Sequence, residues 1–173
     1  MDGITRRDAG KLAIGAWLAT MIAGLAPAAT AAAPAGGMEK RRLGTMRCSL
    51  TGLGLVTLGR DADFDKAARL IHTALDNGIN FFDTGQVYGD TPTGEFLSEP
   101  ALGQALVGRR DKAYIATKCG YAPEHMPRTF VGFSAAQIEA NCDYSLRQLR
   151  TDYIDLYQLH KASDPNVPIE ETL

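Results

Sequence analysis

The chain has 173 residues, of which 45% are hydrophobic and 22% are charged, and its formal net charge is −2. This balance is typical of an ordinary soluble protein and gives no clustered basic surface of the kind that binds nucleic acid. The three cysteines, Cys48, Cys119 and Cys142, lack the CxxC or Cys/His spacing of a zinc site. We therefore expect buried free thiols and no metal site.

Residues 1–35 resemble an export signal followed by a linker. Arg6 and Arg7 supply a basic start, residues 12–26 form an apolar run, and Ala29-Thr30-Ala31 offers a cleavage site. The run of roughly 15 residues is shorter than the about 20 that a membrane-spanning helix needs, so we expect no stable membrane span. The paired arginines resemble the twin-arginine signal and predict an exported, periplasmic protein. The alternatives are an uncleaved extension, or a start at Met38 and a cytoplasmic protein.

From Met38 onward, the pattern predicts strands that alternate with helices. Residues 53–58 are apolar and glycine-flanked, as in a buried strand. Asp63 is a suitable N-cap for a helix whose apolar positions recur from Phe64 to Leu75, and Asn77-Gly78 is a suitable end for it. A strand over residues 79–83 follows.

The second part of the chain repeats this alternation. We expect a helix over residues 97–107, a strand ending at Lys118, a helix that begins after Ser134 with Gln137 completing a capping box, and a strand over residues 154–160. Residues 168–173 read as the first turn of another helix. Successive strands joined by helices predict a parallel sheet that is buried on both faces.

Four polar residues stand at or just after the ends of these strands. Asp83, Lys118 and His160 close three of them, and Tyr88 follows the first within a turn-rich segment. The carboxyl ends of parallel strands share one face, so these side chains are expected to meet in one pocket. An acid, a phenol, an amine and an imidazole form a coherent set for proton transfer. Taken singly, each has an ordinary structural explanation as a turn residue, a packed aromatic or a strand terminus.

These residues lie within longer segments of distinctive sequence. The segments are Arg42-Leu43-Gly44 with Gly52-Leu53-Gly54, residues 78–84 with Val87-Tyr88-Gly89, residues 115–118, and residues 145–149 with 151–157 and His160. In this order they resemble the amino-terminal hairpin and the first four strands of the aldo-keto reductases. The resemblance extends from Glu39 to Leu173.

The resemblance implies a (β/α)₈ TIM barrel, of which residues 36–173 supply the first four β/α units as the amino-terminal half. Such a barrel needs about 250 residues. It implies NADP(H) bound without a Rossmann domain, in agreement with the lack of a GxGxxG motif. It also implies reversible reduction of a small carbonyl substrate, an aldehyde or ketone, to an alcohol. Contacts to the cofactor are expected from Gly54, Leu55, Val56 and Asp83, with Leu55 acting through its backbone.

The resemblance also gives each of the four polar residues a role. Tyr88 is the expected general acid, and the Lys118 ammonium is expected to favour ionisation of its phenol. Asp83 is expected to anchor Lys118, and His160 to orient the carbonyl oxygen. Gln86 and the loop over residues 90–94 are expected near the mouth of the substrate pocket.

Two other functions remain open from the sequence. The half barrel could be a truncated, non-catalytic binding or regulatory module, or an inert fragment, and its exposed sheet edges predict self-association. A barrel enzyme that acts on sugars or phosphates without nicotinamide is the third alternative.

Overall fold

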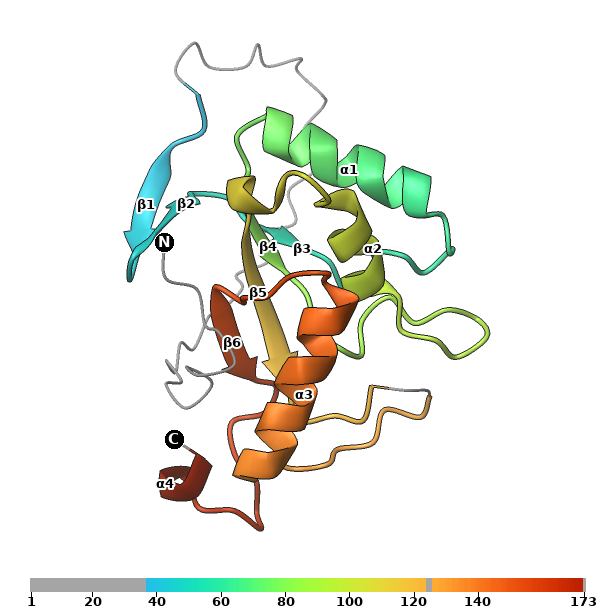
Figure 1. Ribbon diagram of the computed structural model, residues 1–173, viewed down its shortest axis with the longest axis vertical. Helices are drawn as coiled ribbons and strands as arrows, with labels where there is room; N and C mark the ends of the chain where they lie inside the picture. The colour runs from blue at the N-terminus through green and yellow to red at the C-terminus, as the bar shows by residue number, and fades with distance from the viewer. Residues whose placement is uncertain (1–36, 124–125, 173) are drawn as a thin grey trace, which may run out of the picture.

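The computed structural model describes residues 37–123 and 126–172, and the expected export signal lies outside these residues. An antiparallel hairpin, β1 (Lys40–Leu43) and β2 (Met46–Ser49), precedes a four-stranded sheet (Figure 1). The sheet consists of β3 (Leu53–Gly54), β4 (Phe81–Asp83), β5 (Tyr114–Cys119) and β6 (Leu156–Leu159), all parallel and in chain order. The predicted parallel sheet is therefore confirmed.

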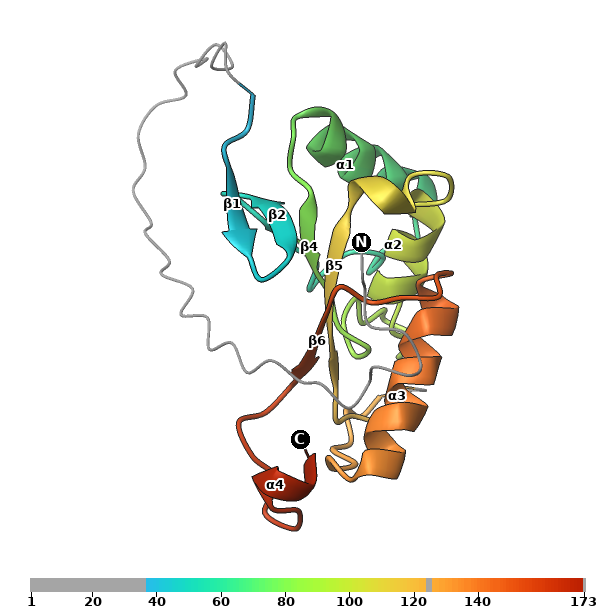
Figure 2. The ribbon, with the colours of Figure 1, turned by 60° about the vertical axis from the view of Figure 1, so that its left-hand side comes forward.

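Three helices connect the strands: α1 (Phe64–Asp76), α2 (Ser98–Ala105) and α3 (Ala135–Gln148). A 3₁₀ turn, η1 (Arg110–Lys112), precedes β5, and a short α4 (Ile169–Thr172) ends the described chain as predicted. Figure 2 shows α1, α2 and α3 on the same side of the sheet. Consecutive right-handed crossovers put their helices on one side when each new strand is added in the same direction.

The prediction of a sheet buried on both faces is wrong for the described residues. Phe82 and Ile115 are completely buried on the helical side. Their neighbours along the strands, Phe81 and Tyr114, are only half-buried. Side chains alternate between the two faces of a strand, so the burial pattern marks a sheet that the helices cover on one face.

The predicted helix starts are confirmed by their caps. The Asp63 carboxylate accepts the Lys66 backbone N–H at 2.8 Å at the start of α1. The Ser134 hydroxyl accepts the Gln137 N–H at 3.4 Å at the start of α3. At the end of α1, Gly78 has a φ of +84°, which a residue without a Cβ adopts readily.

The first predicted strand is much shorter than expected. Only Leu53 and Gly54 pair with β4, because the chain then turns and the Leu58 N–H bonds to the Leu55 carbonyl at 3.1 Å. The apolar run continues only because Leu55 and Leu58 are buried in the core. The buried turn is as apolar as a buried strand, which is why a longer strand was predicted.

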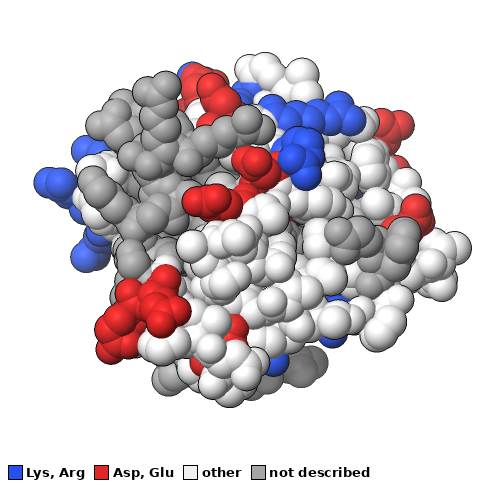
Figure 3. Space-filling model, turned by 60° about the horizontal axis from the view of Figure 1, so that its bottom comes forward, with Lys and Arg blue, Asp and Glu red and all other residues white. Residues whose placement is uncertain are grey.

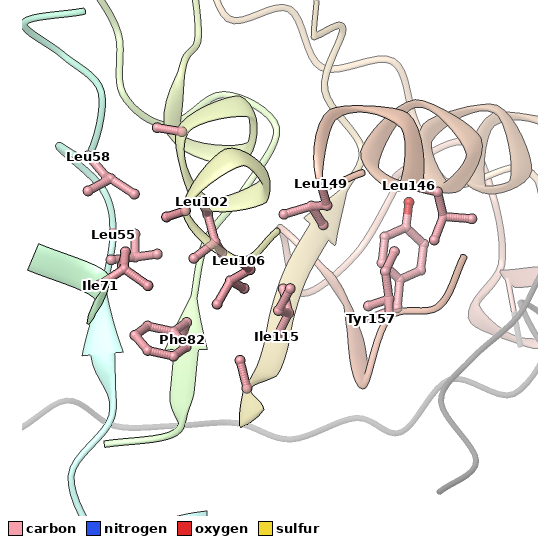
Figure 4. Close-up of a cluster of buried hydrophobic side chains, with 14 of the residues drawn as sticks. Leu55, Leu58, Ile71, Phe82, Leu102, Leu106, Ile115, Leu146, Leu149 and Tyr157 are labelled. Carbon is pink, nitrogen blue, oxygen red and sulfur yellow. The ribbon is translucent and has the colours of Figure 1, made fainter. Parts of the chain in front are cut away.

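The core fills the layer between the sheet and the three helices (Figure 4). Leu55, Ile71, Phe82, Leu102 and Ile115 are each at most 2% exposed. The three cysteines, all among the described residues, are buried, as predicted. The helices α2 and α3 pack at very short range, since a Cβ on Gly103 would lie 2.6 Å from the Gln148 carbonyl oxygen.

A buried asparagine attaches the hairpin to the sheet. The Asn80 side-chain oxygen accepts the Ser49 N–H at 2.6 Å, and its amide nitrogen donates to the Arg47 carbonyl at 3.0 Å. The predicted amino-terminal hairpin is thus present and attached beside β4. None of the helices within residues 37–123 and 126–172 is long and apolar enough to cross a membrane.

Candidate active site

The carboxyl end of the sheet brings the four predicted residues together. Asp83 is the last residue of β4, Lys118 is the penultimate residue of β5, and His160 directly follows β6. The strand order and register place these ends side by side. Tyr88 joins them from the loop after β4.

Lys118 and Asp83 form the ion pair that the sequence predicted. The Lys118 Nζ lies 2.9 and 3.0 Å from the two carboxylate oxygens of Asp83 and donates to the Thr84 carbonyl at 2.7 Å. The Lys118 side chain is 13% exposed, whereas that of Asp83 is 37% exposed. The ammonium is therefore held in a fixed position, and the carboxylate remains open on one side.

Tyr88 lies between Lys118 and His160. The Lys118 Nζ is 4.7 Å from the centre of the Tyr88 ring, within range of a cation–π contact. The His160 ring meets that of Tyr88 edge to face, with centroids 5.6 Å apart and an interplanar angle of 88°. The ammonium therefore sits over the ring face, and no hydrogen bond joins it to the hydroxyl among the described residues.

The backbone around Tyr88 is held both within its own loop and by two neighbouring elements. Its N–H donates to the Gly85 carbonyl at 3.1 Å, and its carbonyl accepts the Ser98 N–H at 3.1 Å. The next N–H, of Gly89, donates to the Val56 carbonyl at 2.8 Å. Gly89 has a φ of +72°, and a Cβ there would collide with the Leu58 carbonyl oxygen. The start of α2 and the turn after β3 therefore fix the position of the phenol.

His160 is a neutral imidazole at pH 7. Its pKa is lowered from 6.5 to about 4, mainly by burial and also by the positive charges of Lys118 and Arg128, which Asp83 partly opposes. Its backbone N–H donates to the Cys119 carbonyl at 3.1 Å, and its ring also meets that of Tyr121 edge to face at 5.0 Å. A neutral imidazole can donate one hydrogen bond and accept one, as an orienting group for a carbonyl requires.

Besides Asp83, the three other residues predicted to contact a cofactor, Gly54, Leu55 and Val56, differ in what they offer. The Leu55 side chain is 2% exposed and packs in the core, while its N–H bonds to the Asp83 carbonyl at 2.8 Å and its carbonyl accepts the Ser98 hydroxyl at 2.8 Å. Gly54 and Val56 are exposed on either side of it, and Gly54 is paired in register with Asp83. Among these three, Gly54 and Val56 are the residues with surface to present to a bound molecule.

Gln86 does not lie at the mouth of a pocket, so that prediction is wrong. Its side chain is 3% exposed and donates to the Asn141 carbonyl at 2.6 Å and to the Ser145 hydroxyl at 3.1 Å. Alternation along the segment after β4 turns Gln86 toward α3. Asp90, in the same loop, does reach the surface and pairs with Arg60 at 3.2 Å and with Arg128 at 3.5 Å.

Two buried polar residues at the start of α2 were not predicted from the sequence. Ser98 and Glu99 are 0% and 2% exposed. The Ser98 hydroxyl bonds to the Thr84 hydroxyl at 2.8 Å, and Glu99 accepts the Thr117 hydroxyl at 2.6 Å. Their burial could have been expected from their spacing. Ser98 and Glu99 stand four and three positions before Leu102, so they lie one helical turn from it on the buried face of α2.

The end of the molecule that carries the site has a mixed surface. Figure 3 views the end of the molecule where the strands finish and shows charged side chains of both signs, mostly around a broad uncharged area. Among the described residues, no group of three His, Cys, Asp or Glu side chains could hold a metal ion. A hollow of about 940 Å³ lies at the other end of the sheet, beside Arg110 and Tyr153, and includes none of the four residues.

A parallel α/β sheet with helices on one face and polar side chains gathered at its carboxyl edge is the arrangement expected of part of a β/α barrel. Residues 50–173 match the Aldo/keto reductase family. The chain therefore belongs to the aldo/keto reductase family, an oxidoreductase family whose solved members indicate a (β/α)₈ barrel. The family predicted from the sequence is confirmed.

Three bacterial relatives show how much of such a protein the chain represents. It is 37% identical over 142 residues to the uncharacterised oxidoreductase YrpG of Bacillus subtilis. This match covers 78% of the present chain and 43% of YrpG. The holo form of aldo-keto reductase AKR11C1 from Bacillus halodurans matches with 40% identity and a TM-score of 0.66, over 78% of this chain and 44% of that one. An aldo-keto reductase from Klebsiella pneumoniae in complex with NADPH matches with 29% identity and a TM-score of 0.58, over 73% and 39%. The chain thus spans less than half of each relative.

Proposed function

We propose that this chain carries the proton-transfer residues of an NADPH-dependent reductase that converts small aldehydes or ketones to alcohols. The observation that supports it most strongly is the convergence of Asp83, Lys118, Tyr88 and His160 at one end of the sheet. Family membership agrees with this assignment, and one solved relative was captured with NADPH.

The residues that border the site fit a nicotinamide cofactor in chemical type. Asp83 keeps an open side from which its carboxylate can accept hydrogen bonds from a ribose hydroxyl. Gly54 has no heavy atom within 4 Å of where a Cβ would stand, so its exposed backbone can be approached closely. Asp83 and the stretch of Gly54, Leu55 and Val56 would hold this part of the cofactor, with Leu55 as the buried support of its exposed neighbours.

The four residues then divide the work of carbonyl reduction. NADPH, when bound, supplies a hydride to the carbonyl carbon. Tyr88 gives its phenolic proton to the carbonyl oxygen, which prevents charge from accumulating there. Neutral His160 donates a hydrogen bond that orients the same oxygen. Lys118, fixed by Asp83, places positive charge beside the phenol and favours the phenolate that proton transfer leaves behind.

The test is turnover by the full chain and by its Tyr88→Phe variant, followed as NADPH consumption with a simple aldehyde. Without the phenolic proton, kcat is expected to fall about 10²- to 10⁴-fold, while NADPH affinity measured by fluorescence titration stays unchanged. Tyr114→Phe is the matched control, because its hydroxyl accepts the Arg47 N–H at the opposite end of β5.

Two results would contradict this proposal. Undiminished turnover in Tyr88→Phe would remove Tyr88 from the role of general acid. A folded wild-type chain that binds NADPH but never consumes it would instead assign the chain to cofactor binding without catalysis.

A further inference from the structure

A buried carboxyl group lies beneath the active site, at the first turn of α2. Glu99 is 2% exposed, yet its carboxylate has no cationic side chain as a hydrogen-bond partner among the described residues. Its Oε1 accepts the Thr117 hydroxyl at 2.6 Å, and its Oε2 has no hydrogen-bond partner. A buried, half-satisfied carboxyl is costly, so its presence requires an explanation.

The first connection of Glu99 leads to the catalytic lysine. Thr117, whose hydroxyl it holds, is completely buried and directly precedes Lys118 on β5. Side chains of successive strand residues point to opposite faces, so Glu99 fixes Thr117 from the helical side while Lys118 projects toward the site. The position of Thr117 therefore sets the position of the Lys118 backbone.

The second connection leads toward the catalytic tyrosine. The Ser145 hydroxyl lies near the Glu99 carboxyl and accepts the Gln86 amide at 3.1 Å. Gln86 is two residues before Tyr88 and is also held by the Asn141 carbonyl at 2.6 Å. Its own Oε1 is another buried acceptor without a partner. The segments that carry Lys118 and Tyr88 are thus both attached around Glu99.

The pKa of Glu99 agrees with its buried position among these hydroxyl groups. Burial raises its pKa to about 7, against the opposing effects of the Thr117 and Ser145 hydroxyls and the Lys118 charge. Tyr157 is a further titratable neighbour of Glu99, and burial raises the pKa of its phenol strongly. A proton on Glu99 turns one carboxyl oxygen from an acceptor into a donor, in a region where Gln86 Oε1 is an unpartnered acceptor.

We propose that Glu99 is a positioning residue that, through Thr117 and the Ser145–Gln86 pair, holds the Lys118 ammonium over the ring of Tyr88. Its importance for catalysis rests on the proposed reductase function. The geometric link itself is present in the folded chain and can be measured without turnover.

The experiment is NMR on the full chain with ¹³C-labelled lysine and tyrosine. Lys118→Met and Tyr88→Phe assign the two signals, and Lys118→Met also gives the displacement of the Tyr88 ring signals when the ammonium is removed. Glu99→Leu is expected to displace the Tyr88 ring signals in the same direction as Lys118→Met does, by about half of that displacement or more. Glu99→Gln, which keeps an acceptor for Thr117 and adds a donor, is expected to retain the wild-type positions.

Two further variants separate positioning from folding. Thr117→Val and Ser145→Ala each cut one of the two connections and are expected to displace the Tyr88 ring signals by a smaller amount. Glu95→Gln is the control, since Glu95 is exposed three residues before the start of α2 and bonds to Thr93. Unchanged Lys118 and Tyr88 signals in folded Glu99→Leu would overturn the proposal. If Glu99→Leu does not fold, unchanged signals in both Thr117→Val and Ser145→Ala would overturn it.

Turnover measured on the same variants distinguishes this proposal from the reductase function. Displaced signals in a chain with no turnover would support the positioning role and remove the catalytic one. Turnover with a normal kcat in Glu99→Leu, together with undisplaced signals, would keep the reductase and remove the positioning role.

Discussion

At the scale of single residues, two buried groups near the site respond to acid in opposite ways. Burial and neighbouring cations lower the pKa of His160 from 6.5 to about 4 in the folded chain. Burial raises that of Glu99 from 4.5 to about 7. Unfolding therefore takes up a proton at His160 and releases one at Glu99 in mildly acidic solution.

The stability that His160 contributes is complete above pH 6.5 and is lost as the pH falls toward 4. We expect His160→Asn to lose less unfolding free energy than the wild type between pH 7 and pH 5. The difference is roughly 1 kcal/mol after allowance for partial exposure. Urea unfolding at the two pH values measures it, and equal losses in both proteins would contradict the neutral, buried imidazole.

The contribution of Glu99 has the opposite sign, because it is complete below pH 4.5 and is lost as the pH rises through about 7. In the same urea experiment, Glu99→Gln is expected to lose more stability on acidification than the wild type. A variant that follows the wild-type curve would show that Glu99 is already ionised at pH 5.

Asp83, Lys118 and His160 could be predicted from sequence because they depend on one geometric rule, whereas Tyr88, which lies in a loop, was predicted from the family resemblance. Residues at the carboxyl ends of neighbouring parallel strands meet, whatever separates them in the chain. Gln86 was misplaced because no such rule applies to a loop, where the direction of each side chain depends on tertiary contacts. Glu99 was missed because charge in a sequence normally indicates exposure, and its burial depends on partners 18 residues away, such as Thr117.

At the scale of elements, helix starts were easier to predict than strand lengths. A cap is a local hydrogen bond between residues three apart, as Asp63 and Ser134 show. The length of β3 depends instead on where the partner strand β4 begins and ends. The apolar run over residues 53–58 could not contain that information.

The contact between α2 and α3 gives a test at the same scale. Alanine is normally favoured over glycine inside a helix by about 1 kcal/mol. At Gly103 an added Cβ would lie 2.6 Å from backbone atoms of Gln148 and Leu149, which cannot rotate away. We therefore expect Gly103→Ala to destabilise the chain by roughly 1–3 kcal/mol in thermal unfolding.

Gly54→Ala is the matched control for this prediction. A Cβ at Gly54 meets nothing within 4 Å, so its effect on the unfolding midpoint should be small. An increase in stability for Gly103→Ala would mean that the two helices lie further apart than the structure shows.

At the scale of the whole molecule, the sheet leaves two edges and one face without helical cover. Within the described residues, β3 and β6 each pair on one side only. Unpaired edges and half-buried apolar side chains such as Phe81 favour association between copies. We expect the average mass in sedimentation equilibrium to rise with protein concentration. A constant monomer mass at all concentrations would contradict this prediction.

The hydrogen bonds at the base of the loop over residues 90–96 determine which of its residues can be replaced without moving Tyr88. The Tyr88 carbonyl accepts the Ser98 N–H, the Gly89 carbonyl accepts the Leu97 N–H, and Asp90 bridges to Phe96. These contacts close the loop beneath its tip, so the phenol is anchored independently of the residues between them. Substitutions over residues 91–95 are therefore expected to leave the position of the Tyr88 phenol unchanged. This tip is where the chain tolerates variation without disturbing the segment that carries Tyr88.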